Sequence, residues 1–102
     1  MNNRDKILDI AMNLNRIGNW AADGYIMKQK RIKVFLNQVS NYLASINQLS
    51  LPEPFKKTFD SFLKQFYVLE KESKETPKDT LLWAEKMMTW GNILTHRIKL
   101  IK

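Results

Sequence analysis

The sequence predicts an all-α fold, an antiparallel four-helix bundle, from three observations. Apolar and small residues recur at steps of three and four, which places them on one face of a helix. Only three glycines and three prolines interrupt the chain, so helix boundaries are few and easily located. The segments between these boundaries are similar in length, as an up-down-up-down bundle requires. A length of 102 residues predicts a single domain over 1–102.

The longest apolar stripe follows the inner heptad positions from Arg4 to Leu49. Of these fourteen positions, only Arg4 and Lys28 carry charged side chains. The other twelve are Ile7, Ala11, Leu14, Gly18, Ala21, Tyr25, Ile32, Phe35, Val39, Tyr42, Ile46 and Leu49. Burial of such a stripe against other helices is what stabilises a bundle.

The stripe passes Gly24 without a change of register, which leaves two architectures open. In the first, the chain breaks there, with Gly24 as a C-terminal cap, and forms helices near 4–22, 25–50, 55–74 and 78–101. In the second, one helix of about 46 residues, roughly 70 Å long, precedes two shorter helices and needs a second chain to cover it, as a dimer. Cations on nearly every side of the helix just after Gly24 favour the break, since a helix charged all round cannot be deeply buried.

Proline marks the two later boundaries. Pro52 and Pro54 end the preceding helix, because proline lacks a backbone donor and crowds the residue before it. Thr76 and Pro77 predict the start of the last helix, with threonine as the cap, and this helix is expected to run to the end of the chain. The seams are expected to bury Ile7, Leu14, Ile32, Phe35, Val39, Tyr42, Ile46, Phe59, Phe62, Phe66, Leu69, Met87, Leu94 and Ile98.

The net charge of +7 is unevenly distributed. No acidic residue occurs between Gly24 and Pro52, and the first part of this segment is rich in cations. These cations are Lys28, Lys30, Arg31 and Lys33, and they form the candidate site for an anion or for nucleic acid. Lysine outnumbers arginine, so nucleic acid would be held by its backbone, without sequence preference. The competing interpretation is a solvated surface that serves solubility alone.

Residue patterns that support chemistry are absent from the sequence. There is no cysteine, and the single histidine, His96, has no carboxylate three or four positions away. There is also no glycine-rich phosphate loop and no nucleophile motif. We therefore expect no catalytic residue, no metal and no cofactor, and a protein that is not an enzyme. No apolar run is long enough for a leader or a membrane span, so we expect a cytoplasmic protein that does not enter a membrane.

Three tryptophans offer a second candidate surface. Trp83 and Trp90 are seven positions apart on the last helix, and Trp20 lies beside small residues of the first stripe. Tryptophan is enriched at binding hot spots, so an exposed ridge of these rings is a candidate partner-binding site; the alternative is packing in the core. The sequence thus predicts a non-enzymatic helical-bundle module for protein–protein interaction, with a homodimer among its expected assemblies. Sequence-independent nucleic-acid binding through the basic cluster is the alternative.

Overall fold

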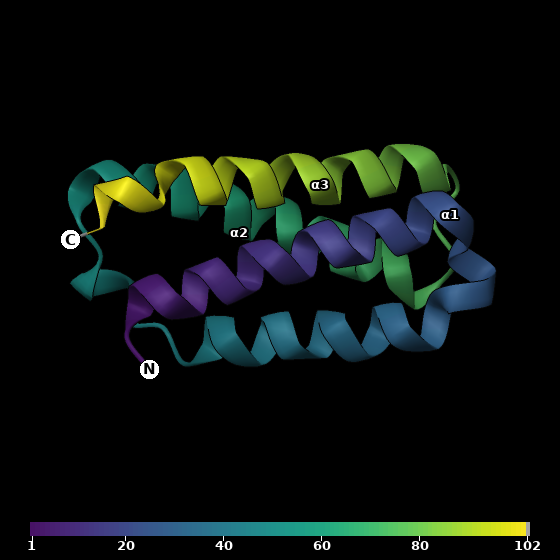
Figure 1. Cartoon of the computed structure of the whole chain (residues 1–102), viewed down its shortest axis with the longest axis horizontal. Helices are drawn as coiled ribbons and strands as arrows, with labels where there is room; N and C mark the ends of the chain where they lie inside the picture. Colours follow the sequence, from purple (N-terminus) through teal and green to yellow (C-terminus); the bar gives the residue numbers. More distant parts are fainter. Residues whose placement is uncertain (102) are drawn as a thin grey trace.

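The computed structural model describes residues 1–101 as all-helical, which confirms the predicted all-α class (Figure 1). Its elements in order are α1 (Asn3–Ala44), the 3-10 helix η1 (Gln48–Ser50), α2 (Glu53–Lys74), α3 (Thr80–Arg97) and the 3-10 helix η2 (Ile98–Leu100). No strand occurs among these residues. The three α-helices fit the alternative of one long N-terminal helix followed by two shorter ones, with a sharp bend in the long one.

Helix α1 reverses direction at Gly24. This residue alone leaves the helical conformation, with φ 167° and ψ 92°. Figure 1 shows the two halves of α1 lying side by side, and hydrogen bonds join them, among them one from Tyr42 Oη to the Asp9 carboxylate at 2.8 Å. We call residues 3–23 the N-arm and residues 25–44 the C-arm.

The bend makes the domain compact and corrects one expectation. A straight α1 would be roughly 63 Å long at 1.5 Å per residue, whereas the longest dimension of the domain is 39 Å. Gly24 does not form the left-handed C-terminal cap that the sequence suggested, because its φ is extended, a conformation open to any residue. The chain turns because each arm can then bury its apolar face against the other helices, which a straight helix in one chain could not do.

Helix α3 approaches the N-arm closely because a glycine stands at each of two contact points. A Cβ at Gly18 would lie 2.8 Å from the carbonyl oxygen of Ala84, and one at Gly91 would lie 2.9 Å from that of Ala11. Real Cβ atoms essentially never approach other heavy atoms that closely. These two glycines therefore allow the spacing of the two helices, and any side chain there would force them apart.

Some predicted helix boundaries were wrong. The last helix begins at Thr80, where the Asp79 side chain accepts a hydrogen bond from a first-turn backbone N–H at 3.0 Å. Asp79 therefore has the capping role expected of Thr76, because a carboxylate satisfies the free donors of the first turn at least as well as a hydroxyl. Helix α1 ends at Ala44, earlier than expected, which leaves Leu49, the last position of the stripe, 84% exposed.

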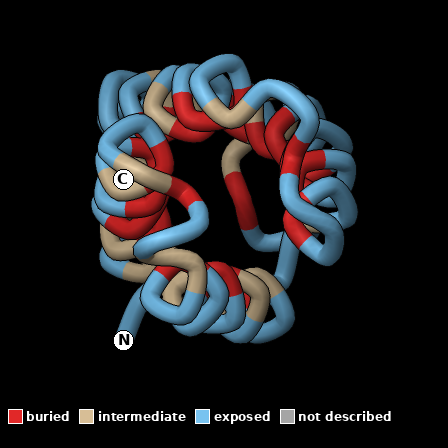
Figure 2. Tube along the Cα trace, turned by 90° about the vertical axis from the view of Figure 1, so that its right-hand side faces the viewer, coloured by how far each residue is buried: buried red, intermediate tan, exposed pale blue. Residues whose placement is uncertain are grey.

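The core lies between the helices and is rich in phenylalanine. Figure 2, which views the domain from its end, shows buried residues on the inward sides of the helices. Twelve of the fourteen expected core residues are buried, and the other two, Phe35 and Tyr42, are half-buried. The prediction missed Ile10, Ile17 and Leu36, which flank the stripe and are also buried. Each arm packs against two neighbours, so its buried face is wider than one heptad seam.

Candidate interaction surface

The outward side of the C-arm carries exposed cations and exposed apolar side chains together. Its members are Ile26, Met27, Lys30, Lys33, Val34 and Asn37, all exposed, and we call this set the C-arm face. Successive helical residues advance by about 100°, so these six positions share roughly a third of the circumference. Ile32, Leu36 and Val39 point the opposite way and are buried. Packing of the core therefore fixes the outward direction of this face.

The structure divides the predicted basic cluster into two pairs. Lys28 forms an ion pair with Asp23 across the bend, and Arg31 stacks on an aromatic ring. Lys30 and Lys33 are exposed, and among residues 1–101 no carboxylate lies within ion-pair distance of either. The positive charge that is fully available to a partner therefore belongs mainly to these two lysines.

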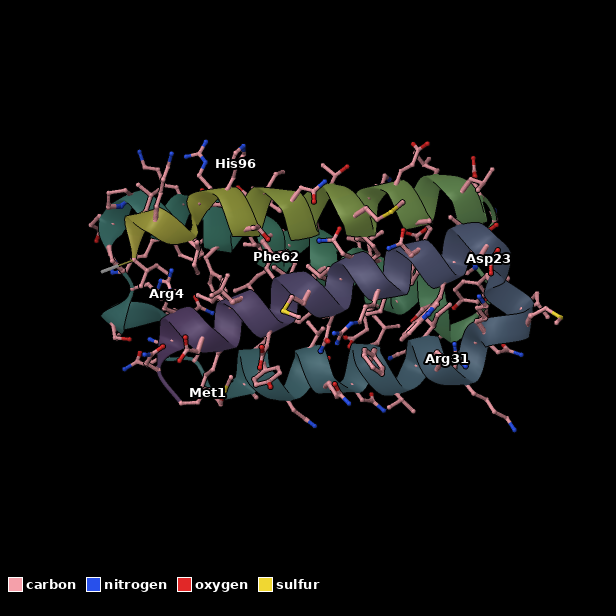
Figure 3. All side chains as sticks on the ribbon, in the orientation of Figure 1. Met1, Arg4, Asp23, Arg31, Phe62 and His96 are labelled. Carbon is pink, nitrogen blue, oxygen red and sulfur yellow. The ribbon has the colours of Figure 1, made fainter. Side chains whose placement is uncertain are left out.

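An aromatic pair that spans the two arms holds Arg31. Its Cζ lies 5.2 Å from the centroid of the Trp20 ring, and that ring meets Phe35 edge to face with centroids 4.8 Å apart. Figure 3 places Arg31 on the C-arm near the bend. A guanidinium over a tryptophan face contributes about 0.5–2 kcal/mol. Arg31 thus helps to join the arms and, being exposed, still adds positive charge beside the C-arm face.

Among residues 1–101, three carboxylates accept a hydrogen bond from a side chain of the C-arm, and none of these donors belongs to the C-arm face. Asp9 accepts a hydrogen bond from Tyr42, Asp23 from Lys28, and Glu70 of α2 from Ser40. The hydrogen bond from Lys28, together with the attraction of the two charges, holds the pKa of Asp23 below its usual value. That carboxylate therefore stays ionised and forms an ion pair with Lys28. The face itself carries no negative charge.

Stability is expected to fall above about pH 10 because of two tyrosines. The hydrogen bond to Asp9, and then burial, raises the pKa of Tyr42 above 10.0, and burial raises the pKa of Tyr25, whose hydroxyl donates to Ser73 O at 3.2 Å. Both phenols ionise more readily in the unfolded chain. Their contribution to stability is therefore complete below the unfolded pKa and is lost as pH rises through the folded values.

Urea denaturation between about pH 8 and 11 checks this expectation. Tyr42→Phe should flatten the alkaline decline in the free energy of unfolding, and the double variant Tyr42→Phe/Tyr25→Phe should flatten it further. An unchanged decline in the double variant would show that other groups cause it.

The tryptophans do not form the exposed ridge that their spacing suggested. Trp83 is 2% exposed, and its Nε1 donates to the carbonyl of Leu69 at 2.9 Å. Trp90 is half-buried against Phe62, with ring centroids 5.7 Å apart, and Trp20 is half-buried between the arms. Trp83 and Trp90 each precede a small seam residue by one position, on the side that faces α2, so packing turns them inward. The three rings therefore lie at two separate interfaces.

Groups that could support chemistry are scattered over residues 1–101. His96 is exposed and projects outward from α3 (Figure 3). In this part of the chain no three histidine or acidic side chains are placed to hold a metal ion. A surface recess of about 650 Å³ lies at the α2–α3 turn, where Lys71, Lys74, Glu72 and Glu75 line it. Charges of both signs in an open recess favour no particular ligand.

The sequence interpretation missed the apolar members of the C-arm face. Ile26, Met27 and Val34 are 59%, 90% and 53% exposed. The signal was present, since all three lie off the heptad stripe, where a bundle helix is expected to carry polar residues. Several exposed apolar side chains on one helical face indicate a contact with something other than the core.

Comparison with known proteins indicates no function for this surface. None of the described helices has an apolar stretch long enough to traverse a bilayer. Comparison of the chain with protein-family models, with curated proteins and with solved structures found no match. A function for this chain therefore has to be inferred from the C-arm face itself.

Proposed function

We propose that this protein is a non-enzymatic interaction module that binds the acidic surface of a partner protein through the C-arm face. The composition of that face carries the proposal: two lysines without an ion-pair partner in residues 1–101, three exposed apolar side chains and no carboxylate. Protein interfaces combine apolar contact with charge complementarity, the first for affinity and the second for orientation and association rate.

The mixture of side chains favours a protein partner over nucleic acid. Nucleic acid is held mainly through its phosphates, which a row of cations contacts and exposed isoleucine or methionine does not. Lys28 is paired with Asp23, so a phosphate would have to compete with that carboxylate for it. Lysine is a hydrated point charge suited to a carboxylate at the rim of an interface. An acidic helix with apolar anchors matches both parts of the C-arm face.

The proposal includes the finer form of the fold, in which the two arms act as separate helices of an antiparallel four-helix bundle. Hydrogen bonds between the arms and the outward direction of the C-arm face support it. Three glycines inserted after Gly24 should change the free energy of unfolding by less than about 1 kcal/mol, because lengthening a loop costs little. One residue inserted between Ile32 and Lys33 should cost several times more, since it rotates the rest of the C-arm by about 100°. Chemical denaturation measures both, and equal losses would contradict the bundle.

Charge reversal on the C-arm face tests the binding. The probe is a fluorescent helical peptide with glutamate on one face and leucine on the other; polyglutamate and a single-stranded DNA oligonucleotide are the comparison ligands. We expect the acidic–apolar peptide to bind the protein more tightly than either comparison ligand. Lys30→Glu/Lys33→Glu should weaken peptide binding at least about tenfold, because it replaces attraction by repulsion at the interface.

Lys64→Glu/Lys71→Glu on α2 is the matched control, since it changes the net charge equally at two exposed positions outside the face. The affinity of this variant for the peptide should stay within about twofold of that of the unaltered protein, because distant exposed charges are screened by salt. DNA bound more tightly than either peptide, with a fall of about 100-fold in affinity between about 50 and 200 mM salt, would instead support the nucleic-acid alternative. Equal effects of the two double variants would rule out the C-arm face as the binding site.

A further inference from the structure

The bend in α1 consists of one residue, and its conformation is not specific to glycine. Gly24 has an extended φ of 167°, and a Cβ there would meet nothing nearer than Met27, at 3.9 Å. The residues on both sides are helical. The local backbone therefore does not dictate the bend, and contacts between the arms keep the chain folded back.

The helical pattern continues through the bend. Ala21, Tyr25 and Ile32 are buried and are spaced by four and seven residues, so a helix straightened at Gly24 keeps the buried faces of both arms on one side. Such a helix has 42 residues and would be about 63 Å long. In a single chain it would leave apolar surface in water, since α2 and α3 are long enough to cover only one arm.

Contacts across the bend distinguish the closed chain from a straightened one. Asp23 and Lys28 pair although they are five positions apart, which on a straight helix sets them about 140° apart around the axis. Trp20 also reaches Arg31 and Phe35 only because the arms fold back on each other. The aromatic contacts can be made again between the N-arm of one chain and the C-arm of another.

We propose that this protein forms a homodimer by exchange of the N-arm, with α1 straightened through Gly24 in each chain. The N-arm of one copy then packs against the C-arm, α2 and α3 of the other, and each half of the dimer has the same core as the monomer. Ile26 and Met27 lie two and three positions after the hinge and are largely exposed in the single chain. At the junction of the two halves these residues of both chains come together and lose contact with water, which favours the dimer. This inference does not rest on the proposed binding function, although the dimer covers Ile26 and Met27, which belong to the C-arm face.

Gly24→Ala tests the proposal. Alanine is compatible with the closed bend, and it favours a continuous helix more strongly than glycine does at each of the two hinges. The dimerisation constant should therefore rise roughly 20-fold. Sedimentation equilibrium over a range of protein concentrations measures this constant, with the unaltered chain as the reference.

Spin labels distinguish arm exchange from an ordinary surface dimer. The chain has no cysteine, so Asp5→Cys and Ala44→Cys create unique labelling sites at exposed positions near the free ends of the arms. These ends are adjacent in the closed chain, where Lys6 Nζ donates to Ser45 O at 3.1 Å. In a straightened α1 the two labelled positions would be roughly 58 Å apart. The Gly24→Ala dimer, mixed with excess unlabelled Gly24→Ala chain, should show this long distance within one chain.

Three glycines inserted after Gly24 provide the control, because a flexible loop permits the closed chain and disfavours a continuous helix. This insertion variant should be monomeric at concentrations where Gly24→Ala is dimeric. The proposal is overturned if Gly24→Ala stays monomeric at its highest soluble concentration or if its dimer keeps the short distance between labels. Equal dimerisation of the insertion variant also overturns it.

Discussion

Gly18→Val is expected to lower the free energy of unfolding by about 3 kcal/mol or more. A Cβ at this position would lie 2.3 Å from Met88 Cγ and 2.8 Å from the carbonyl oxygen of Ala84. The methionine side chain can move, but the carbonyl belongs to the backbone of α3, so the N-arm and α3 must separate. Added groups in a packed core cost about 1–3 kcal/mol, and separation also removes contacts along the seam. Replacing glycine within a helix returns at most about 1 kcal/mol, so the clash dominates.

Guanidinium chloride denaturation followed by circular dichroism measures this loss. Gly24→Ala at low protein concentration is the control, because a Cβ there meets only ordinary contacts, and it should lose no stability. Gly91 tests the mechanism from the other side of the seam, where a Cβ would lie 2.9 Å from the Ala11 carbonyl oxygen. If the two glycines set one common spacing, Gly18→Ala/Gly91→Ala should cost less than the sum of the single variants, since the first substitution already separates the helices. Strict additivity would mean that each site relaxes by itself.

Most of the core could be predicted because burial follows helical periodicity. The stripe through Ile7, Leu14 and Ile32 identifies one face of α1, whether the helix is bent or straight. The reversal at Gly24 could not be settled in this way, since a bent and a straight helix have the same heptad register. The contacts that distinguish them, such as Tyr42 with Asp9, join residues far apart in the sequence and leave no local pattern.

The basic cluster could be located from the sequence, whereas the availability of its members could not. Whether Lys28 forms an ion pair depends on Asp23 across the bend, and whether Arg31 is stacked depends on a ring of the N-arm. Neither contact can be identified until the fold is known. The exposed apolar residues of the C-arm face were different, because their positions off the stripe already marked them in the sequence.

Trp83→Ala is expected to destabilise the domain by about 3–5 kcal/mol, the range for removal of a large buried aromatic side chain. Trp83 is almost fully buried, its Nε1 donates to the carbonyl of Leu69 at 2.9 Å, and its ring meets Tyr25 edge to face with centroids 5.4 Å apart. One ring thus joins α3 to α2 and to the start of the C-arm. Trp83→Phe keeps most of the volume and should cost only about 1–2 kcal/mol, largely through the lost hydrogen bond.

Denaturation midpoints of these variants decide whether Trp83 is a core residue or a binding residue. The adjacent and exposed Leu82 supplies the control, and Leu82→Ala should change stability by no more than about 0.5 kcal/mol. A residue that served only a partner would show the reverse pattern, with stability retained and peptide binding lost. A cost below about 1 kcal/mol for Trp83→Ala would therefore contradict its place in the core. Because a domain of this size has only about 5–15 kcal/mol of stability, the expected loss should lower its thermal midpoint by more than about 10 °C.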